Sequence, residues 1–103
     1  MSANRPDLLD SLAAIGSAFD DVPQSVALAK VAEELGEASA AYIGAGGYNP
    51  RKGRTHLPQD VAVELVDVAI AAVTAMQAFD PQWRLALRQR VAEVLARSQA
   101  LAP

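Results

Sequence analysis

Residues 61–79, VAVELVDVAIAAVTAMQAF, decide how this chain folds. The stretch contains two charged residues, Glu64 and Asp67, and apolar side chains occupy almost every other angular position of a helix. A helix that is apolar nearly all round must be buried nearly all round. Four helices in about 100 residues rarely enclose one of their number, so we expect a homodimer or homotetramer with this helix at or beside the interface.

The same stretch is about as long as a bilayer requires, and a membrane span is the alternative. Its two acids leave only about a dozen acid-free residues, and charged side chains are costly at membrane depth. We therefore interpret it as a core helix and expect no membrane partner. Residues 1–6 lack the apolar run of a signal peptide, and the chain has no cysteine. Both features favour a cytoplasmic protein.

Signals for three further helices lie on either side of this stretch. Pro23 suits a first helical turn, Gly44 suits the position after a last turn, and Pro81 follows an aspartate that can cap a fourth helix. No segment shows the alternation typical of strands. We expect one all-α domain over residues 1–103, resembling a four-helix bundle. The predicted helices span residues 7–20, 23–43, 59–79 and 81–99.

The composition limits the classes of function. Hydrophobic residues make up 51% of the chain and aromatic residues only 5%, which favours closely packed helices with small side chains. The formal net charge is −3 at pH 7. A general nucleic-acid binder needs a basic surface, so we expect no nucleic-acid partner.

Two pairs of acids occur at a spacing of three residues, Glu34 with Glu37 and Glu64 with Asp67. Residues three apart share one helix face, so both pairs can point into the cleft between packed helices. Four converging carboxylates need protons or a divalent cation to offset their repulsion. Mg²⁺ prefers such oxygen ligands and commonly also binds substrate phosphates; Mn²⁺ is a possible substitute. The pattern therefore predicts a metal site suited to phosphoanhydride chemistry.

An alternative places Glu34 and Glu37 on a solvated face, with Lys30 pairing to Glu34 one turn away. That explanation fails for the acids of the third helix, because the rest of its surface is apolar. Zinc and di-iron sites fit less well, because His56 is the only histidine and lies in a predicted loop.

Residues 44–58, GAGGYNPRKGRTHLP, have no periodicity and form a predicted loop between the two acidic helices. The loop contains Arg51, Lys52 and Arg54 and no acid. Together with Lys30, these cations can offset phosphate charge that a metal ion does not reach. An ordinary solvated loop is the alternative.

The acidic motifs resemble the EExxE…ExxD signature of MazG-like proteins, in the all-α nucleoside triphosphate pyrophosphatase superfamily. The loop Asn49-Pro-Arg-Lys-Gly53 resembles one found in a subgroup of small MazG-like proteins. The resemblance covers residues 30–70, and the fourth helix departs from it by carrying arginines where relatives often have lysine and asparagine. The residues that carry the signature are Glu33-Glu34-Leu-Gly-Glu37 and Glu64-Leu-Val-Asp67.

The resemblance implies Mg²⁺-dependent hydrolysis of a nucleoside triphosphate to the monophosphate and pyrophosphate, often to remove non-standard nucleotides, by dimers or tetramers. Glu34 or Glu37 is expected to orient or deprotonate the attacking water. The alternatives are a phosphoribosyl-ATP or deoxynucleotide pyrophosphohydrolase, or a non-catalytic dimerisation or regulatory module that still binds nucleotide or metal. The implied metal ligands are Glu34, Glu37, Glu64 and Asp67, and Glu33 is a further candidate. The candidate substrate-binding residues are Lys30, Asn49, Arg51, Lys52 and Arg54.

Overall fold

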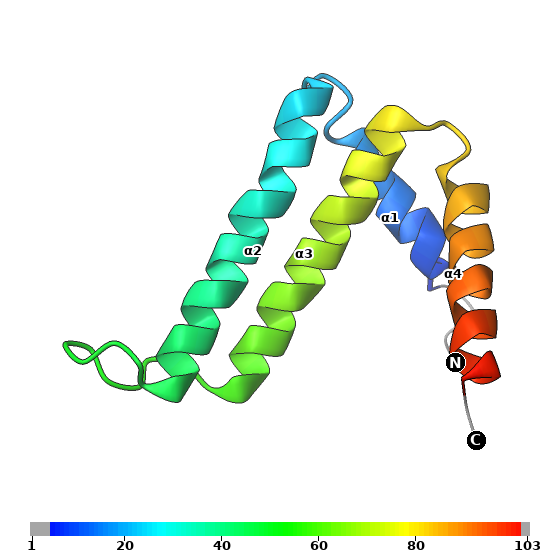
Figure 1. Ribbon diagram of the computed structural model, residues 1–103. Helices are drawn as coiled ribbons and strands as arrows, with labels where there is room; N and C mark the ends of the chain where they lie inside the picture. The colour runs from blue at the N-terminus through cyan, green and yellow to red at the C-terminus, as the bar shows by residue number, and fades with distance from the viewer. Residues whose placement is uncertain (1–4, 102–103) are drawn as a thin grey trace.

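A computed structural model describes residues 5–101, and within this range the chain contains four helices and no strand (Figure 1). The all-α prediction is confirmed. Residues 1–4, on which part of the signal-peptide argument rests, lie outside the described range. The helices are α1 (Leu8–Ser17), α2 (Gln24–Gly46), α3 (Pro58–Phe79) and α4 (Trp83–Ala100).

Helices α2 and α3 form an antiparallel hairpin and lie side by side along their lengths (Figure 1). The buried side chains between them are small: Ala38 and Ala41 come from α2, and Ala75 comes from α3. Small residues at a helix contact let the two backbones approach closely, because the distance between helix axes depends on the side chains between them. The alanine-rich composition therefore has a structural reason.

Helix α2 continues three residues beyond the predicted end at residue 43, and Gly44 is not its stop. The left-handed residue that ends the helix is Gly47, with φ of 69°. Gly44 is buried, and a Cβ there would collide with the side chains of Thr55 and His56. The Thr55 N–H also donates to the Gly44 carbonyl at 3.0 Å. Glycine is needed here for close packing of the loop, which spans residues 47–57.

The other helix ends follow local capping. The Asp7 carboxylate accepts a hydrogen bond from the Leu9 N–H at 3.1 Å at the start of α1, which ends at residue 17 rather than at the predicted residue 20. The Asp60 carboxylate accepts from the Leu57 N–H at 2.8 Å at the start of α3. Asp80 accepts from the Gln82 N–H at 2.8 Å, so the predicted cap forms a turn and α4 begins two residues later than predicted.

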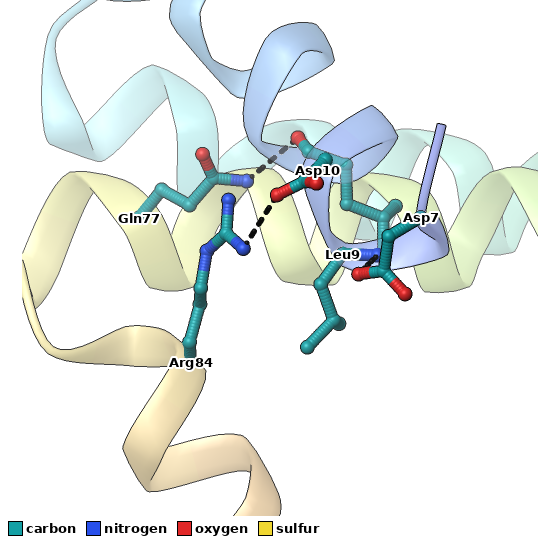
Figure 2. A network of polar contacts seen from close by, with 6 residues as sticks. Asp7, Leu9, Asp10, Gln77 and Arg84 are labelled. Atoms are coloured by element: carbon teal, nitrogen blue, oxygen red, sulfur yellow. Dashed lines mark hydrogen bonds and ion pairs between the residues drawn. The ribbon is translucent and has the colours of Figure 1, made fainter. Parts of the chain in front are cut away.

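Helix α1 packs against α3, and a few polar contacts fix both α1 and α4 (Figure 2). The Gln77 side chain of α3 donates to the Leu12 carbonyl at 3.0 Å. Arg84 of α4 donates to Asp10 of α1 at 2.8 Å, and the neighbouring Trp83 is buried. Residues 88–101 are all exposed, and α4 stands apart from the α2–α3 hairpin (Figure 1).

The single chain is open. Its radius of gyration is 17.0 Å, whereas a compact chain of about 100 residues has about 13 Å. Its accessible surface is 7745 Å², against about 5,500 Å² for a compact protein of this mass. Half of the residues of α3 are exposed, and Ala75 is the one residue of this described helix that is buried rather than half-buried or exposed. The nearly complete burial predicted for this helix is not reached within one chain.

By length and composition, α3 could also cross a membrane, with a mean hydropathy of 1.7 over its most apolar window. A helix that becomes buried in a soluble assembly has the same appearance. Glu64 and Asp67 lie within the helix, and Glu64 is half-buried, whereas Asp67 is exposed.

Candidate metal centre

The hairpin register brings acids from α2 and α3 together. Glu34 and Glu37 lie near the middle of α2, and Glu64 lies two turns into α3, where the antiparallel helices pass each other. One carboxylate oxygen from each of these three residues lies within 4.8 Å of the other two. The spacing of three residues places Glu34 and Glu37 on one face of α2, and hairpin packing brings Glu64 of α3 beside them.

The acids differ in their exposure to solvent. Glu34 and Glu64 are half-buried, whereas Glu37 is exposed. The Oε2 atom of Glu64 is buried and has no hydrogen-bond partner within the described part of the chain. An unpaired buried carboxylate oxygen carries a desolvation cost that a proton or a cation can offset. The chemistry of this position therefore fits a cation ligand.

Asp67 lies beside this cluster without joining the group of three. It is exposed, and with Glu34 and Lys30 it borders a cavity. Partial burial raises the pKa of Glu34, and the negative charges of Glu37 and Asp67 raise it further. Glu34 therefore senses charge from both helices, and a bound cation would relieve that repulsion.

Lys30 pairs with Glu33 at 3.4 Å, and both side chains are partly exposed. The solvated-face alternative expected Lys30 to pair with Glu34, and the structure does not form that pair. Glu34 instead lies toward α3. Lys30 borders the same cavity, so one cation sits at the edge of the acidic cluster.

A cavity of about 150 Å³ adjoins the acids between α1, α2 and α3. Ile15 of α1 and Phe19, in the turn that follows α1, form its apolar part together with Ile70 of α3. Sequence reasoning did not predict a cavity here, because only the packing of α1 on α3 forms it. An apolar cavity of about 150 Å³ can accept a single aromatic ring. Its remaining lining residues are Ala27, Lys30, Glu34, Asp67, Ala71 and Thr74.

The basic loop lies at the far end of the hairpin. Asn49 shapes it: its side-chain oxygen accepts from the Arg51 N–H at 3.1 Å, and its carbonyl accepts from the Gly53 N–H at 2.9 Å. Gly53 has φ of 67°, which favours glycine. Arg51 is exposed, as are the other two loop cations, Lys52 and Arg54.

The loop is distant from the acids along the helix axis. Nine residues separate Glu37 from the end of α2, a rise of about 14 Å. Among the described residues, no ion pair joins a loop cation to an acid of the cluster. The structure therefore brings Lys30 to the acids but not the loop residues Asn49, Arg51, Lys52 and Arg54, whose contact with substrate stays a prediction.

Comparison of the chain with protein-family models, curated proteins and solved structures found no match. The resemblance to MazG-like proteins therefore rests on the acidic motifs and the loop sequence alone.

Proposed function

We propose that this chain is a Mg²⁺-dependent nucleotide pyrophosphohydrolase of the MazG-like type. Its substrate would be a nucleoside triphosphate, which it hydrolyses to the monophosphate and pyrophosphate, with removal of non-standard nucleotides as its role. The observation that carries this proposal is the unpaired buried oxygen of Glu64, within reach of Glu34 and Glu37. A divalent cation would offset the charge of this cluster, and cations held by carboxylates commonly bind phosphates.

The donor set supports Mg²⁺ or Mn²⁺ over other metals. The three clustered ligands are all carboxylates, with no histidine or cysteine among them. Hard oxygen ligands suit Mg²⁺ and Mn²⁺, whereas zinc and copper favour nitrogen and sulfur. When bound, Mg²⁺ would neutralise phosphate charge and lower the pKa of a water. We propose Asp67 as the fourth ligand because it borders the same cavity as Glu34 and its charge raises the pKa of Glu34.

The surrounding residues have roles that follow from their positions. Glu34 or Glu37 would accept the proton of the attacking water, because both belong to the cluster and neither forms an ion pair with a Lys or Arg among the described residues. Lys30 would stabilise charge that develops on the phosphates. The apolar cavity beside Glu34, with Phe19 in its wall, would accept the nucleotide base.

The loop cations have a more distant role in this proposal. Arg51, Lys52 and Arg54 would attract the polyphosphate by long-range charge, since they belong to the loop beyond the end of α2, which lies about 14 Å along that helix from Glu37. We further propose that the protein is cytoplasmic and assembles as a dimer or tetramer, with α3 at or beside the interface.

A second candidate function is a non-catalytic helical module that binds a nucleotide or metal without hydrolysis. The exposure of Asp67 favours it, because a complete metal site would hold all four acids close together. The distance of the loop cations from the cluster favours it as well.

Pyrophosphate release from a panel of nucleoside triphosphates with Mg²⁺ tests the proposal. Glu64→Gln keeps the shape of the side chain but removes the negative charge, and we expect a loss of at least about 100-fold, since even indirect support of a metal ligand is worth 10- to 100-fold. The matched control is Glu93→Gln on α4, because Glu93 pairs with Arg90 far from the cluster. Equal rates for wild type and Glu64→Gln would refute the enzyme assignment. Metal binding without turnover would favour the second candidate.

A further inference from the structure

A second cavity, of about 300 Å³, lies farther along the hairpin from the acids than the first. Phe19, Ala27 and Thr74 line both cavities, so the two adjoin at these residues. The lining of the second cavity also contains the polar side chains of Asp20, Gln24 and Gln77. A ligand that occupies the first cavity can therefore extend into a second, more polar one.

The two carboxamides of the second cavity have their nitrogen atoms engaged. The Gln77 Nε2 donates to the Leu12 carbonyl at 3.0 Å, and the Gln24 Nε2 donates to the Ala78 carbonyl at 2.7 Å. Because a carbonyl can only accept, each bond fixes which end of the amide is nitrogen and leaves the oxygen as an acceptor. Figure 2 shows the Gln77 oxygen turned away from the contact with α1.

Asp20 adds a charged acceptor to the same cavity. Its carboxylate forms no ion pair within residues 5–101, and the cavity lining contains no Lys, Arg or His. An ionised carboxylate accepts hydrogen bonds and cannot donate them, and its hydrogen bonds are stronger than those between neutral groups. Asp20 is exposed, whereas Thr74 and Gln77 are half-buried. This chemistry favours a ligand edge that presents N–H donors.

The second cavity lies at a distance from the acids that suits the far edge of a nucleotide. On α3, Thr74 follows Asp67 by seven residues and Gln77 follows it by ten, which correspond to rises of about 10 Å and about 15 Å. This span is about the length of an extended nucleoside monophosphate. With the phosphates at the acids, the base ring would lie between Ile15 and Ile70, and its outer edge would reach the second cavity.

We propose that the second cavity recognises an exocyclic amino group on the base, so that cytosine and adenine nucleotides are preferred over those of uracil and hypoxanthine. This inference rests on the proposed function, because it takes the acids as the phosphate-binding end. Asp20 and the Gln77 oxygen would accept the two amino hydrogens. A deaminated base would instead place a carbonyl oxygen against these acceptors, and a mismatched polar group discriminates more strongly than a difference in size. The non-standard nucleotides removed would then be modified amino bases.

Hydrolysis of two matched pairs of nucleotides, CTP with UTP and ATP with ITP, tests the inference. In at least one pair we expect kcat/KM to be at least about tenfold higher for the amino member, which is the range of one hydrogen bond to a charged group. The preferred pair also shows whether the site holds one ring or two. Equal values within both pairs would overturn the inference and leave the proposed hydrolysis intact. Absence of turnover with every nucleoside triphosphate would instead refute the proposed function.

Two adjacent aspartates provide matched variants. Asp20 and Asp21 are both exposed in the turn after α1, but only Asp20 lines the cavity. Asp20→Asn supplies an N–H that can donate to an oxo group, so it should lower the preference for the amino member by about tenfold. Asp21→Asn removes the same charge and should keep the preference of wild type. Equal preferences in the two variants would contradict the role of Asp20.

A binding measurement tests the same inference without turnover. Nucleoside monophosphates are the expected products and are not cleaved, so isothermal titration calorimetry can compare CMP with UMP and AMP with IMP on wild type. We expect at least about tenfold tighter binding of the amino member in the pair that hydrolysis favours, and in at least one pair if no turnover occurs. Equal affinities within both pairs, or no binding of any of the four, would overturn the inference.

Discussion

The two sides of the α2–α3 hairpin differ in their chemistry. One side gathers the carboxylates of Glu34, Glu37 and Glu64 and is partly covered by α1, and these negative charges are not neutralised by an ion pair within the described residues. The other side, where Leu35, Tyr42 and Leu65 border a groove without charged residues, is exposed to solvent. Glu64 and Leu65 are adjacent in sequence yet face different sides, because successive helical residues are turned by about 100°. One helix pair therefore carries a charged side and an apolar side, and a cation should stabilise only the first.

The largest expected effect is the stabilisation of the acidic side by Mg²⁺. At about 100 times its dissociation constant, a cation that binds only the folded acids raises the free energy of unfolding by about 2.7 kcal/mol. Thermal denaturation with and without Mg²⁺ measures this effect. The shift should disappear in Glu64→Gln and persist in Val66→Lys. A wild-type midpoint that neither Mg²⁺ nor Mn²⁺ moves would contradict a metal centre on the acidic side.

Replacement of a cation beside the acids should lower kcat/KM more than replacement of a distant cation, and this difference is the next largest expected effect. Lys30→Gln should lower kcat/KM by about tenfold, which corresponds to about 1.4 kcal/mol, because Lys30 borders the acidic cavity. Lys52→Gln should lower it by less than about threefold, since its charge acts from a distance and is screened by salt. Steady-state kinetics at fixed ionic strength compares them. A larger effect at Lys52 would mean that the phosphates bind at the loop and not beside the acids.

The smallest expected effect concerns protons on Glu34. Partial burial, then Glu37 and Asp67, raises the pKa of Glu34, so the metal-free folded state binds this proton more tightly than the unfolded state. The stability that the proton contributes is present at low pH and is lost as pH rises through the raised pKa. Glu34→Gln, which stays neutral, should therefore raise the thermal midpoint at pH 7 without metal, and the gain should shrink toward pH 4.

Glu33→Gln is the control for this pH dependence. Glu33 pairs with Lys30 and lies outside the cluster of three, so its replacement should give no such gain at pH 7. With Mg²⁺ present, wild type should become more stable than Glu34→Gln, because the cation needs the charged carboxylate. A lower midpoint for metal-free Glu34→Gln at pH 7 would show that repulsion at this residue is not significant.

The helices could be predicted because their signals are local. Pro23 directly precedes α2, Asp80 and Pro81 lie in the turn before α4, and the apolar residues of α3 recur at helical spacing. The end of α2 could not be predicted from Gly44, since this glycine serves the return of the loop, and the hydrogen bond from Thr55 that anchors the loop is a tertiary contact. Local sequence does not contain that information.

In the candidate site, too, local sequence predicts some features and tertiary packing sets the others. The spacing of Glu34 with Glu37 predicted one shared face, and the short loop makes α2 and α3 pack against each other. The exposure of Asp67 depends on the rotation of α3 about its axis, and the distance of Arg51 from the acids depends on the path of the loop. Both are set by packing that no single segment specifies.

The short connection between α2 and α3 also affects how the chain folds. Only residues 47–57 separate the two helices, so their contacts close a small loop, and contacts between nearby segments form fast. The hairpin should therefore form early, with exposed apolar side chains such as Leu35, Tyr42 and Leu65 still in contact with water. During synthesis the nascent protein should then pass through a stage prone to aggregation, so that its yield should fall as its concentration rises.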